Sequence, residues 1–308
     1  MTSETLRKIQ SRVAALCQEK VVRTNISCLT LYKSERKTDP VLFVYEPRIY
    51  IVVQGSKQVS LYDRIYYYNE RQYLVSTVDL PVSGMITEAS PEKPYLAACI
   101  SFSPLEILEV IEACGTDAMP RPSSRSGMGL SALTDDLLDT VLRLLNCLGS
   151  EQDVHFLAPL IKKEIIYRML AGEQGKTLYD IANDRSDLSG INRAIAFLRQ
   201  SFSENGDMTT LPSLAGMSRS RFYKKFQQAT NLTPLQYRLR LRMQEARRML
   251  LHDVMSVAEI GFRVGYESPS QFNREYRKVF GLPPHADMKR IRTIGIDRYK
   301  DENEAIWR

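Results

Sequence analysis

Near its C-terminal end the chain repeats one helical pattern, and this repeat constrains the fold more than any other feature. In the first copy, which reads SRSRFYKKFQQAT, Phe222 and Phe226 lie four positions apart. In the second copy, SPSQFNREYRKVF, Phe272 and Tyr276 have the same spacing. Side chains four apart share one helix face, so each aromatic pair predicts an inward face. One such unit is typical of many helical hairpins, but two in succession indicate a repeated structure.

A supporting segment precedes each copy. LPSLAG stands before the first, and its Pro212 predicts a helix that is shortened or starts late. Before the second, Ser256 and Glu259 have the spacing of a capping box that opens a helix, and Gly265 supplies the turn. Each copy is therefore predicted to be a helix-turn-helix unit, with Ser218 or Ser268 capping its second helix.

One continuous helix is predicted between the two units. The stretch TPLQYRLRLRMQEARRMLLH has an apolar stripe at heptad-like spacing, formed by Leu239, Met243, Ala246 and Leu250. Such a helix is about 27 to 30 Å long at 1.5 Å per residue. It could hold two helices roughly one turn of B-DNA apart, about 34 Å.

Positive charge is concentrated in this part of the chain. Residues 190–295 hold 18 Lys and Arg against 8 Asp and Glu, a net charge of +10, whereas the whole chain has +6. Residues 1–189 hold 21 against 24. This asymmetry indicates a nucleic-acid-binding domain at 190–295, a second domain at 1–189 and a polar tail at 296–308. The alternative is a solvated basic surface.

The N-terminal domain begins with short runs rich in aromatic and β-branched residues, such as VLFVY, IYIVVQ and RIYYY. Turn signals separate them at intervals of about eight to twelve residues, which favours a small antiparallel β-barrel at about 25–102. Helices are predicted at about 103–175, and a polar linker at about 176–189. The fold class is therefore α+β: an N-terminal antiparallel β-barrel with flanking helices and an all-α C-terminal domain.

Two features of these helices can be tested. Ser103, Pro104 and Gly115 have the positions of an N-cap, a first helical residue and a C-cap. Further on, a helix has an apolar stripe that could cover the barrel or pair with the same helix of a second subunit. Its residues are Leu137, Val141, Leu144 and Leu148.

The outward sides of the repeated helices are polar. Amide and guanidinium groups there have the donor geometry that reads adenine and guanine edges, and nearby cations suit phosphates. The candidate base-reading residues are Ser220, Arg221, Tyr223, Lys224, Gln227, Ser270, Gln271, Asn273 and Arg274. The candidate phosphate contacts are Arg219, Lys225, Arg238, Arg242, Arg277 and Lys278.

Five cysteines occur at scattered positions, Cys17, Cys28, Cys99, Cys114 and Cys147. The number is odd and no CxxC pair is present, so we expect buried, reduced thiols and neither disulfides nor a zinc site. Cys99 lies in the apolar run LAACISF, where burial would raise the pKa of its thiol and make it unreactive. The alternative is a redox or electrophile sensor.

Catalysis is not expected. The three histidines, His155, His252 and His285, all fall outside the predicted barrel, so a histidine metal site cannot form there. Asp79, Glu88 and Glu92 have no partner base or nucleophile at informative spacing. We therefore predict no catalytic residue, metal or cofactor. No run of about 18 apolar residues and no secretory signal is evident, so we expect no membrane contact and a cytoplasmic location.

About 100 C-terminal residues resemble the AraC/XylS family of transcription regulators. LAGMSRSRFYKKFQQATNLTPLQYRLRLRMQEARRML is similar to that family's first unit and connecting helix, and VAEIGFRVGYESPSQFNREYRKVFGLPP to its signature segment. IVVQGSKQV, VDLPVSG and EASPEKPYLA resemble a branch with a cupin-like N-terminal barrel. The resemblance implies that the barrel regulates and that the repeat reads double-stranded DNA.

The resemblance also implies partners: RNA polymerase, a small-molecule effector, and a second copy bound through the N-terminal domain. Aromatic strand residues could form the effector site, although strand tyrosines more often pack in cores. The candidates are Tyr50, Tyr66, Tyr68 and Tyr73. An architectural or RNA-binding protein that uses the same positive surface is the competing hypothesis, and such a protein would respond mainly to salt.

Overall fold

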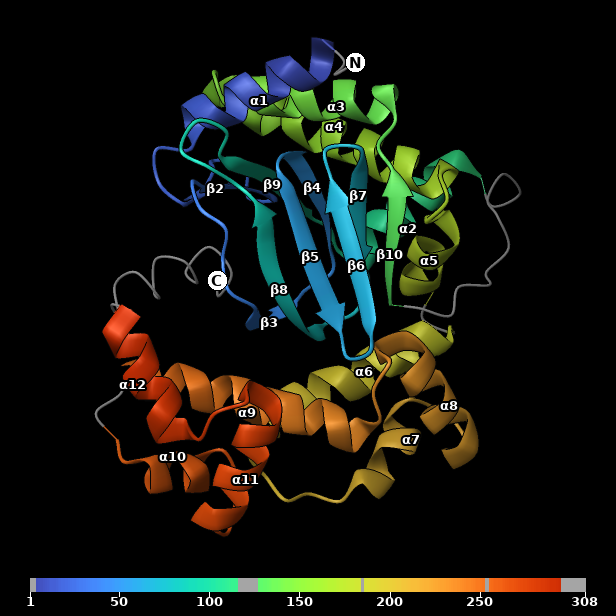
Figure 1. Ribbon diagram of the computed structural model, residues 1–308. Helices are drawn as coiled ribbons and strands as arrows, with labels where there is room; N and C mark the ends of the chain where they lie inside the picture. The colour runs from blue at the N-terminus through green and yellow to red at the C-terminus, as the bar shows by residue number, and fades with distance from the viewer. Residues whose placement is uncertain (1–3, 116–126, 184–185, 253–254, 295–308) are drawn as a thin grey trace.

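The computed structural model describes residues 4–115, 127–183, 186–252 and 255–294. Two β-sheets and five helices form the N-terminal part, and helices alone form the C-terminal part (Figure 1). The predicted α+β class is confirmed. None of the helices in the described ranges is long and apolar enough to cross a bilayer.

The strands are β1 (Val21–Arg23), β2 (Leu29–Ser34), β3 (Val41–Tyr45), β4 (Arg48–Gln54), β5 (Ser56–Leu61), β6 (Arg64–Asn69), β7 (Gln72–Ser76), β8 (Leu80–Glu88), β9 (Tyr95–Ser101) and β10 (Met128–Ala132). The N-terminal helices are α1 (Glu4–Leu16), α2 (Pro104–Cys114), α3 (Asp135–Cys147), α4 (Glu151–Ala171) and α5 (Gly175–Ala182). The C-terminal helices are α6 (Asp187–Gln200), α7 (Leu211–Leu214), α8 (Arg219–Thr230), α9 (Pro234–His252), α10 (Val257–Arg263), α11 (Pro269–Phe280) and α12 (Pro284–Ile294).

The strands form two antiparallel sheets that face each other. One has the order β1-β2-β9-β4-β7-β10 and the other β3-β8-β5-β6. The predicted cupin-like arrangement is confirmed, as two facing sheets that do not join into a closed barrel. Strand β10 was missed, because it follows α2 and adds to the sheet edge by pairing with β7.

Both faces of the six-stranded sheet are buried, as alternate side chains on its central strands show. Ile49, Ile51 and Val53 of β4 pack on the side of the N-terminal helices. Tyr50 and Val52 pack on the side of the second sheet. Successive strand residues point to opposite faces, so this sheet is a partition between two cores.

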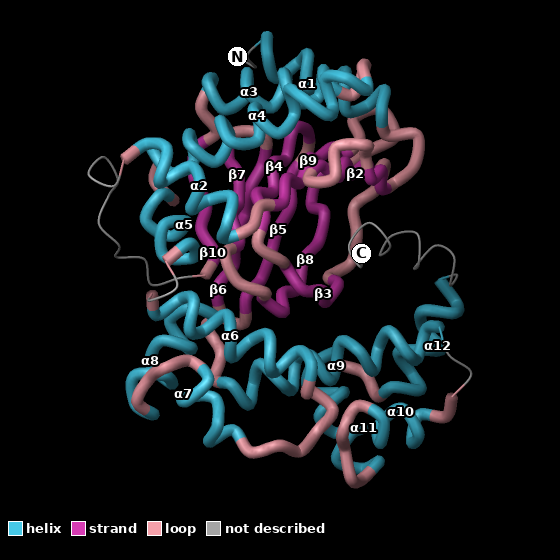
Figure 2. Tube along the Cα trace, turned by 180° about the vertical axis from the view of Figure 1, so that it is seen from behind, coloured by secondary structure: helices cyan, strands magenta, loops and turns pink. Residues whose placement is uncertain are grey.

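Helices α1 to α5 cover the outer face of the six-stranded sheet (Figure 2). The predicted caps of α2 are present, and Glu106 completes a capping box with Ser103. In α3, Leu137, Val141 and Leu144 are at most 3% exposed, and Leu148 packs against the same core. The apolar stripe of α3 therefore covers the sheet and is not available to a second subunit.

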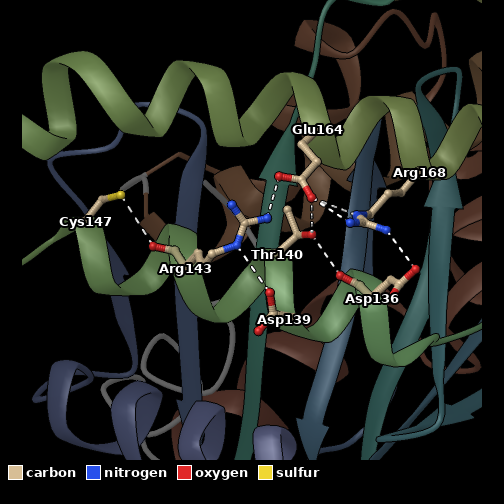
Figure 3. A network of polar contacts seen from close by, with 7 residues as sticks. All are labelled: Asp136, Asp139, Thr140, Arg143, Cys147, Glu164 and Arg168. Carbon is tan, nitrogen blue, oxygen red and sulfur yellow. Dashed lines mark hydrogen bonds and ion pairs between the residues drawn. The ribbon is translucent and has the colours of Figure 1, made fainter.

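A polar network fixes α4 against α3 (Figure 3). Glu164 of α4 accepts hydrogen bonds from Arg143 and from the hydroxyl of Thr140, both in α3. Arg168 binds Glu164 at 2.7 Å and Asp136 at 2.9 Å. Three of these contacts join α3 to α4, and the pair of Arg168 with Glu164 lies within α4.

The segment predicted as a polar linker, 176–189, contains structure. Half of it, residues 176–182, belongs to α5, in which Leu178 and Ile181 are buried in the helix-covered core. Helix α6 begins at Asp187, close to the predicted boundary. The predicted tail, 296–308, lies outside the described residues.

The C-terminal helices divide between two cores. Helices α6 to α8 and the start of α9 share one cluster with the inner faces of both sheets. The end of α9 packs with α10 and α11 in a separate cluster, with Met288 of α12 at its margin. Helix α9 is thus the one element with buried residues in both clusters.

Candidate functional site

Helices α8 and α11 repeat one another at an offset of fifty residues. Phe222 and Phe226 of the first correspond to Phe272 and Tyr276 of the second, and all four are 0% exposed. Each helix ends at a residue with left-handed backbone, Asn231 in one and Gly281 in the other. Ser218 and Ser268 occupy the N-cap positions, but neither side chain makes the predicted capping bond.

The supporting helices differ between the two units. Helix α7 has only four residues and carries Pro212 in its first turn, as predicted from the sequence. Helix α10 opens on the capping box of Ser256 and Glu259. The turns that follow pass through Gly216 and Gly265 at φ of 68° and 93°, a region open to glycine at little cost.

The polar sides of α8 and α11 face solvent. The predicted base-reading residues that are exposed on α8 are Ser220, Arg221, Lys224 and Gln227. Those that are exposed on α11 are Ser270, Gln271, Asn273 and Arg274. Tyr223 is half-buried, with its ring edge-on to Phe222. Eight of the nine predicted base-reading side chains are therefore open to a ligand.

An acidic residue lies beside α8. Asp187 of α6 forms ion pairs with Arg221 at 2.9 Å and with Lys225 at 2.8 Å. Both cations border a shallow hollow that Ser220, Lys224 and Gln228 complete. An approaching anion would compete with one carboxylate for two of the cations on this helix.

The predicted phosphate contacts fall into two groups. Arg219, Arg277 and Lys278 are exposed. Arg238, by contrast, donates to the carbonyl oxygens of Glu204 and Gly206 at 3.3 and 3.0 Å.

Arg242 requires a correction. It is 7% exposed, and its guanidinium donates to the carbonyls of Phe202, Ser203, Glu204 and Gly265. These bonds tie the turn of the second unit to the segment after α6. Arg242 therefore has a structural position inside the domain, not the predicted phosphate contact.

Helix α9 joins the two units. Tyr237 and Leu241 pack in the cluster that α8 shares with the sheets, whereas Met243, Ala246 and Leu250 pack with α10 and α11. Its 19 residues give a length of about 28 Å. The predicted continuous helix is thus present, with α8 and α11 packed at its two ends (Figure 1).

A cavity of about 920 Å³ lies between the sheets and the C-terminal helices. Strands β2 to β5 and β9 supply half of the residues that line it. Arg199 and Phe202 line it from the end of α6 and just beyond, and Leu241, Gln244 and Arg248 line it from α9. A molecule bound there would touch both the sheet domain and the connecting helix.

One of the four predicted effector tyrosines, Tyr50, lines this cavity. Tyr73 packs in the helix-covered core, because its side chain points to the opposite face of the six-stranded sheet from that of Tyr50. Tyr68 is 1% exposed and its hydroxyl bonds that of Tyr45 at 3.0 Å, while Tyr66 packs at the margin of the inner core. The cavity is therefore not lined by the other three predicted effector residues, Tyr66, Tyr68 and Tyr73.

The sequence prediction missed one charged residue of the cavity, Lys57. It lies on β5 at the same parity as the buried Val59 and Leu61. Its Nζ is 5.1 Å from the ring centroid of Phe43 and 5.5 Å from that of Tyr45. Burial lowers the pKa of Lys57 to about 8. The sequence did contain a signal for this residue, because Lys57 stands at a strand position whose side chain points inward.

Four of the five cysteines are buried, as predicted, but Cys114 at the end of α2 is exposed. Cys99 lines the cavity and is 4% exposed. Burial raises the pKa of its thiol to about 12, so the protonated form prevails at neutral pH. In the described part of the chain, no cluster of three or more His, Cys, Asp or Glu residues is arranged to hold a metal.

Two family models match the chain. Residues 25–177 match the AraC-type transcriptional regulator N-terminus, and residues 213–290 match a helix-turn-helix domain. The first match covers strands β2 to β10, helices α2 to α4 and the start of α5, and the second runs from the end of α7 through α8 to α11 and into α12.

Individual proteins are similar over shorter stretches. The MmsAB operon regulatory protein of Pseudomonas aeruginosa is 31% identical over 106 residues, 34% of each chain. The transcriptional activator RhaS of Klebsiella pneumoniae is 26% identical over 144 residues, 47% of this chain and 50% of RhaS. The chain thus spans about a third to a half of the length of these curated relatives.

The fold has a close parallel among solved structures. ToxT of Vibrio cholerae superimposes with a TM-score of 0.55 at 12% identity, covering 84% of this chain and 97% of ToxT. At this identity the similarity shows the shared architecture of sheets and helices.

Proposed function

Because the chain belongs to the AraC/XylS family of transcription regulators, we propose that it binds specific sequences in double-stranded DNA through α8 and α11. The observation that carries this proposal is the repeat itself. Two equivalent helices, each anchored by a buried aromatic pair, present polar side chains to solvent from the two ends of one helix. A generic helical core would not need both polar sides exposed.

The length of α9 suits two successive major grooves. At about 28 Å the helix is slightly shorter than the roughly 34 Å between successive grooves on one DNA face. The diameter of the flanking helices makes up the difference. One protomer would then occupy two grooves.

In this proposal, helix α11 makes most of the contacts that read the DNA bases. Gln271 and Asn273 carry amides that can pair with adenine, and Arg274 can donate two bonds to guanine. Arg219, Lys224, Arg277 and Lys278 are exposed cations suited to phosphates. Arg221 and Lys225 become available to phosphates if their ion pairs with Asp187 break.

A small-molecule effector would act through the cavity. The cavity wall includes α9, the helix that sets the relation of the two reading helices, so a bound molecule can favour one placement of α9 over another. ToxT, the fold neighbour, has been solved with an unsaturated fatty acid bound. We propose that the sheet domain is a regulatory binding module rather than an enzyme, and that RNA polymerase is the partner at the promoter.

The test is a gel-shift competition on a fragment selected from the host genome. Gln271→Ala, Asn273→Ala and Arg274→Ala should each lose about tenfold or more in affinity for that fragment, while keeping affinity for unrelated DNA. Arg263→Ala, an exposed cation on α10, is the matched control and should change little. Equal losses on selected and unrelated DNA, or equal binding to RNA, would favour the architectural alternative.

We further propose a homodimer through α4. With α3 buried, α4 still has an exposed apolar stripe, Phe156, Leu160 and Tyr167, which are 72%, 53% and 48% exposed. These residues stand on one face of a helix of 21 residues, and Leu157 lies beside them. A second copy offers the same stripe and would bury both.

Sedimentation velocity of the full chain tests this proposal. The double variant Phe156→Lys with Leu160→Lys should be monomeric at concentrations where the wild type is a dimer. Exchange of another exposed apolar residue, Leu105→Lys, should leave the dimer intact. A wild-type chain that stays monomeric at all concentrations rules out the α4 dimer.

A further inference from the structure

Lys57 lies in an apolar part of the cavity wall. Its strand neighbours on the same face, Val59 and Leu61, are 0% and 1% exposed. Two aromatic rings flank its Nζ, those of Phe43 and Tyr45. Ring faces attract a cation, but they compensate only part of the cost of removing it from water.

Four other cations of the cavity wall have acidic partners, whereas Lys20 and Arg36 are exposed to solvent. Lys33 pairs with Glu35 at 3.3 Å, and Arg248 pairs with Glu245 at 2.7 Å. The remaining ion pairs of the wall are Arg48 with Glu46 and Arg199 with Asp79. Lys57 is partly buried, and within the described part of the chain it has neither an acidic partner nor a hydrogen bond, so the cavity contains a positive charge that the protein leaves uncompensated.

The rings around Lys57 form a platform for an apolar body. Tyr45 and Tyr50 stack with their centroids 3.9 Å apart, and Phe43 meets Tyr45 edge-on at 4.9 Å. Their polar atoms are already used: the hydroxyl of Tyr45 bonds Tyr68, and that of Tyr50 donates to the carbonyl of Glu46. This part of the wall therefore offers aromatic surface and one cation, not the many hydrogen-bonding groups that a sugar would need.

From these observations we infer that the cavity binds an organic monocarboxylate, whose acid group pairs with Lys57 and whose apolar body packs on Phe43, Tyr45 and Tyr50. The inference rests on the proposed regulatory function and gives the chemical class of its effector. The pKa of about 8 keeps Lys57 mostly protonated at pH 7, as the pairing requires. A cationic ligand would be repelled, and a neutral one would leave the buried charge unpaired.

The acid also reaches the DNA-binding domain in this arrangement. Leu241 and Gln244 of α9 line the same cavity as Lys57. A volume of about 920 Å³ accepts a drug-sized molecule, so the apolar body can extend from the sheet toward α9. Longer acids should therefore bind more tightly than short ones, through contact with α9.

Isothermal titration of the full chain at pH 7 tests the inference with three matched probes: 4-phenylbutanoate, 4-phenylbutanamide and 4-phenylbutylamine. The same titration is repeated with octanoate, dodecanoate and hexadecanoate. We expect 4-phenylbutanoate to bind about tenfold or more tightly than 4-phenylbutanamide, as one charge-assisted hydrogen bond supplies, and 4-phenylbutylamine to bind least. An amide that matches its acid, or no saturable binding by any acid, overturns the inference.

Substitution of Lys57 supplies the second measurement. Lys57→Met should remove the preference for acid over amide, whereas Lys57→Arg should keep it, because the charge stays. Lys93→Met, at an exposed lysine outside the cavity, is the control and should leave the preference intact. Acid binding by Lys57→Met as tight as that of the wild type overturns the inference.

DNA binding separates failure of this inference from failure of the proposed function. The ligand-free Lys57→Met chain should still bind the selected fragment and show the circular dichroism of the wild type. If so, loss of acid binding reports on Lys57 and not on folding. If the wild type binds the fragment but no acid, the regulator proposal stands and the carboxylate inference falls.

Discussion

The hydroxyl of Tyr237 donates a hydrogen bond of 2.7 Å to the backbone carbonyl of Asp79, and so joins α9 to the sheet domain. Tyr237 is 0% exposed and packs in the cluster that both sheets share with α8. The side chain of Asp79 pairs in turn with Arg199 of α6. The first helix-turn-helix unit is thus fused to the sheets, whereas the second has its own core and depends on α9 for its placement.

Replacing Tyr237 with Phe should destabilise the protein by about 1 kcal/mol, the typical net value of one buried hydrogen bond. The ring is kept, so packing against Phe226 should persist. Urea denaturation gives the change from a lower midpoint at an unchanged slope. Tyr223→Phe is the control, since the hydroxyl of this half-buried tyrosine has no bond within the described residues. Equal midpoints for the Tyr237→Phe chain and the wild type would contradict the assigned contact.

Replacing Asp187 with Asn should strengthen DNA binding several-fold, most at low salt. The change removes a carboxylate that engages Arg221 and Lys225 beside the proposed interface. Both cations then become available to phosphates, and a negative charge that repels DNA is lost. Affinity for the selected fragment, measured against salt concentration, checks this expectation.

Asp139→Asn is the matched control for Asp187→Asn. It removes the same charge from α3, in the N-terminal domain, and should not alter affinity. Weaker DNA binding by Asp187→Asn would indicate that the carboxylate positions the two cations for DNA, the opposite of the role expected here.

The C-terminal repeat could be predicted from the sequence because its signals are local. The spacing of Phe272 and Tyr276 fixes the inward side of α11, and the exposure of Gln271 and Arg274 follows from helix geometry alone. Arg242 shows the limit of this reasoning. Its partners are carbonyls of residues 202–204 and of Gly265, which only the folded chain brings together around its guanidinium.

The cavity could be predicted only in part, for a related reason. Strands β4 and β7 are buried on both faces, so runs such as IYIVVQ lack the alternation of hydrophobic and polar residues that marks the inner side. Tyr50 and Tyr73 look alike in the sequence yet face different cores. A shift of one residue in register decides which of them meets a ligand.

Replacing Asp287 with Asn should cost about 3 kcal/mol, as is usual when one member of a buried ion pair is lost. Asp287 is 2% exposed and accepts bonds from Arg247 at 3.0 Å and from the hydroxyl of Tyr276 at 2.8 Å. It thereby joins α9, α11 and α12. Urea denaturation is again the measurement, with Glu275→Gln as control, because its pair with the exposed Lys278 should contribute less than about 1 kcal/mol. If the two substitutions lowered the free energy of unfolding by similar amounts, burial would not be what makes the Asp287 ion pair the stronger one.

Replacing Lys57 with Met should stabilise the ligand-free protein at neutral pH, by up to about 3 kcal/mol. Burial lowers the pKa of Lys57 from 10.5 to about 8, so between these pH values the unfolded chain binds more protons than the folded one. Lys57 therefore destabilises the fold fully below pH 8, and this penalty disappears as the pH rises toward 10.5. Cys99, Tyr45, Tyr68 and Tyr95 around the cavity have raised pKa values and stay neutral in this range.

Thermal unfolding at pH 7 and at pH 9.5 should accordingly show a larger gain in stability for Lys57→Met at the lower pH. A gain of the same size at both values would mean that methionine acts through packing alone and that the lysine is not held as a buried charge.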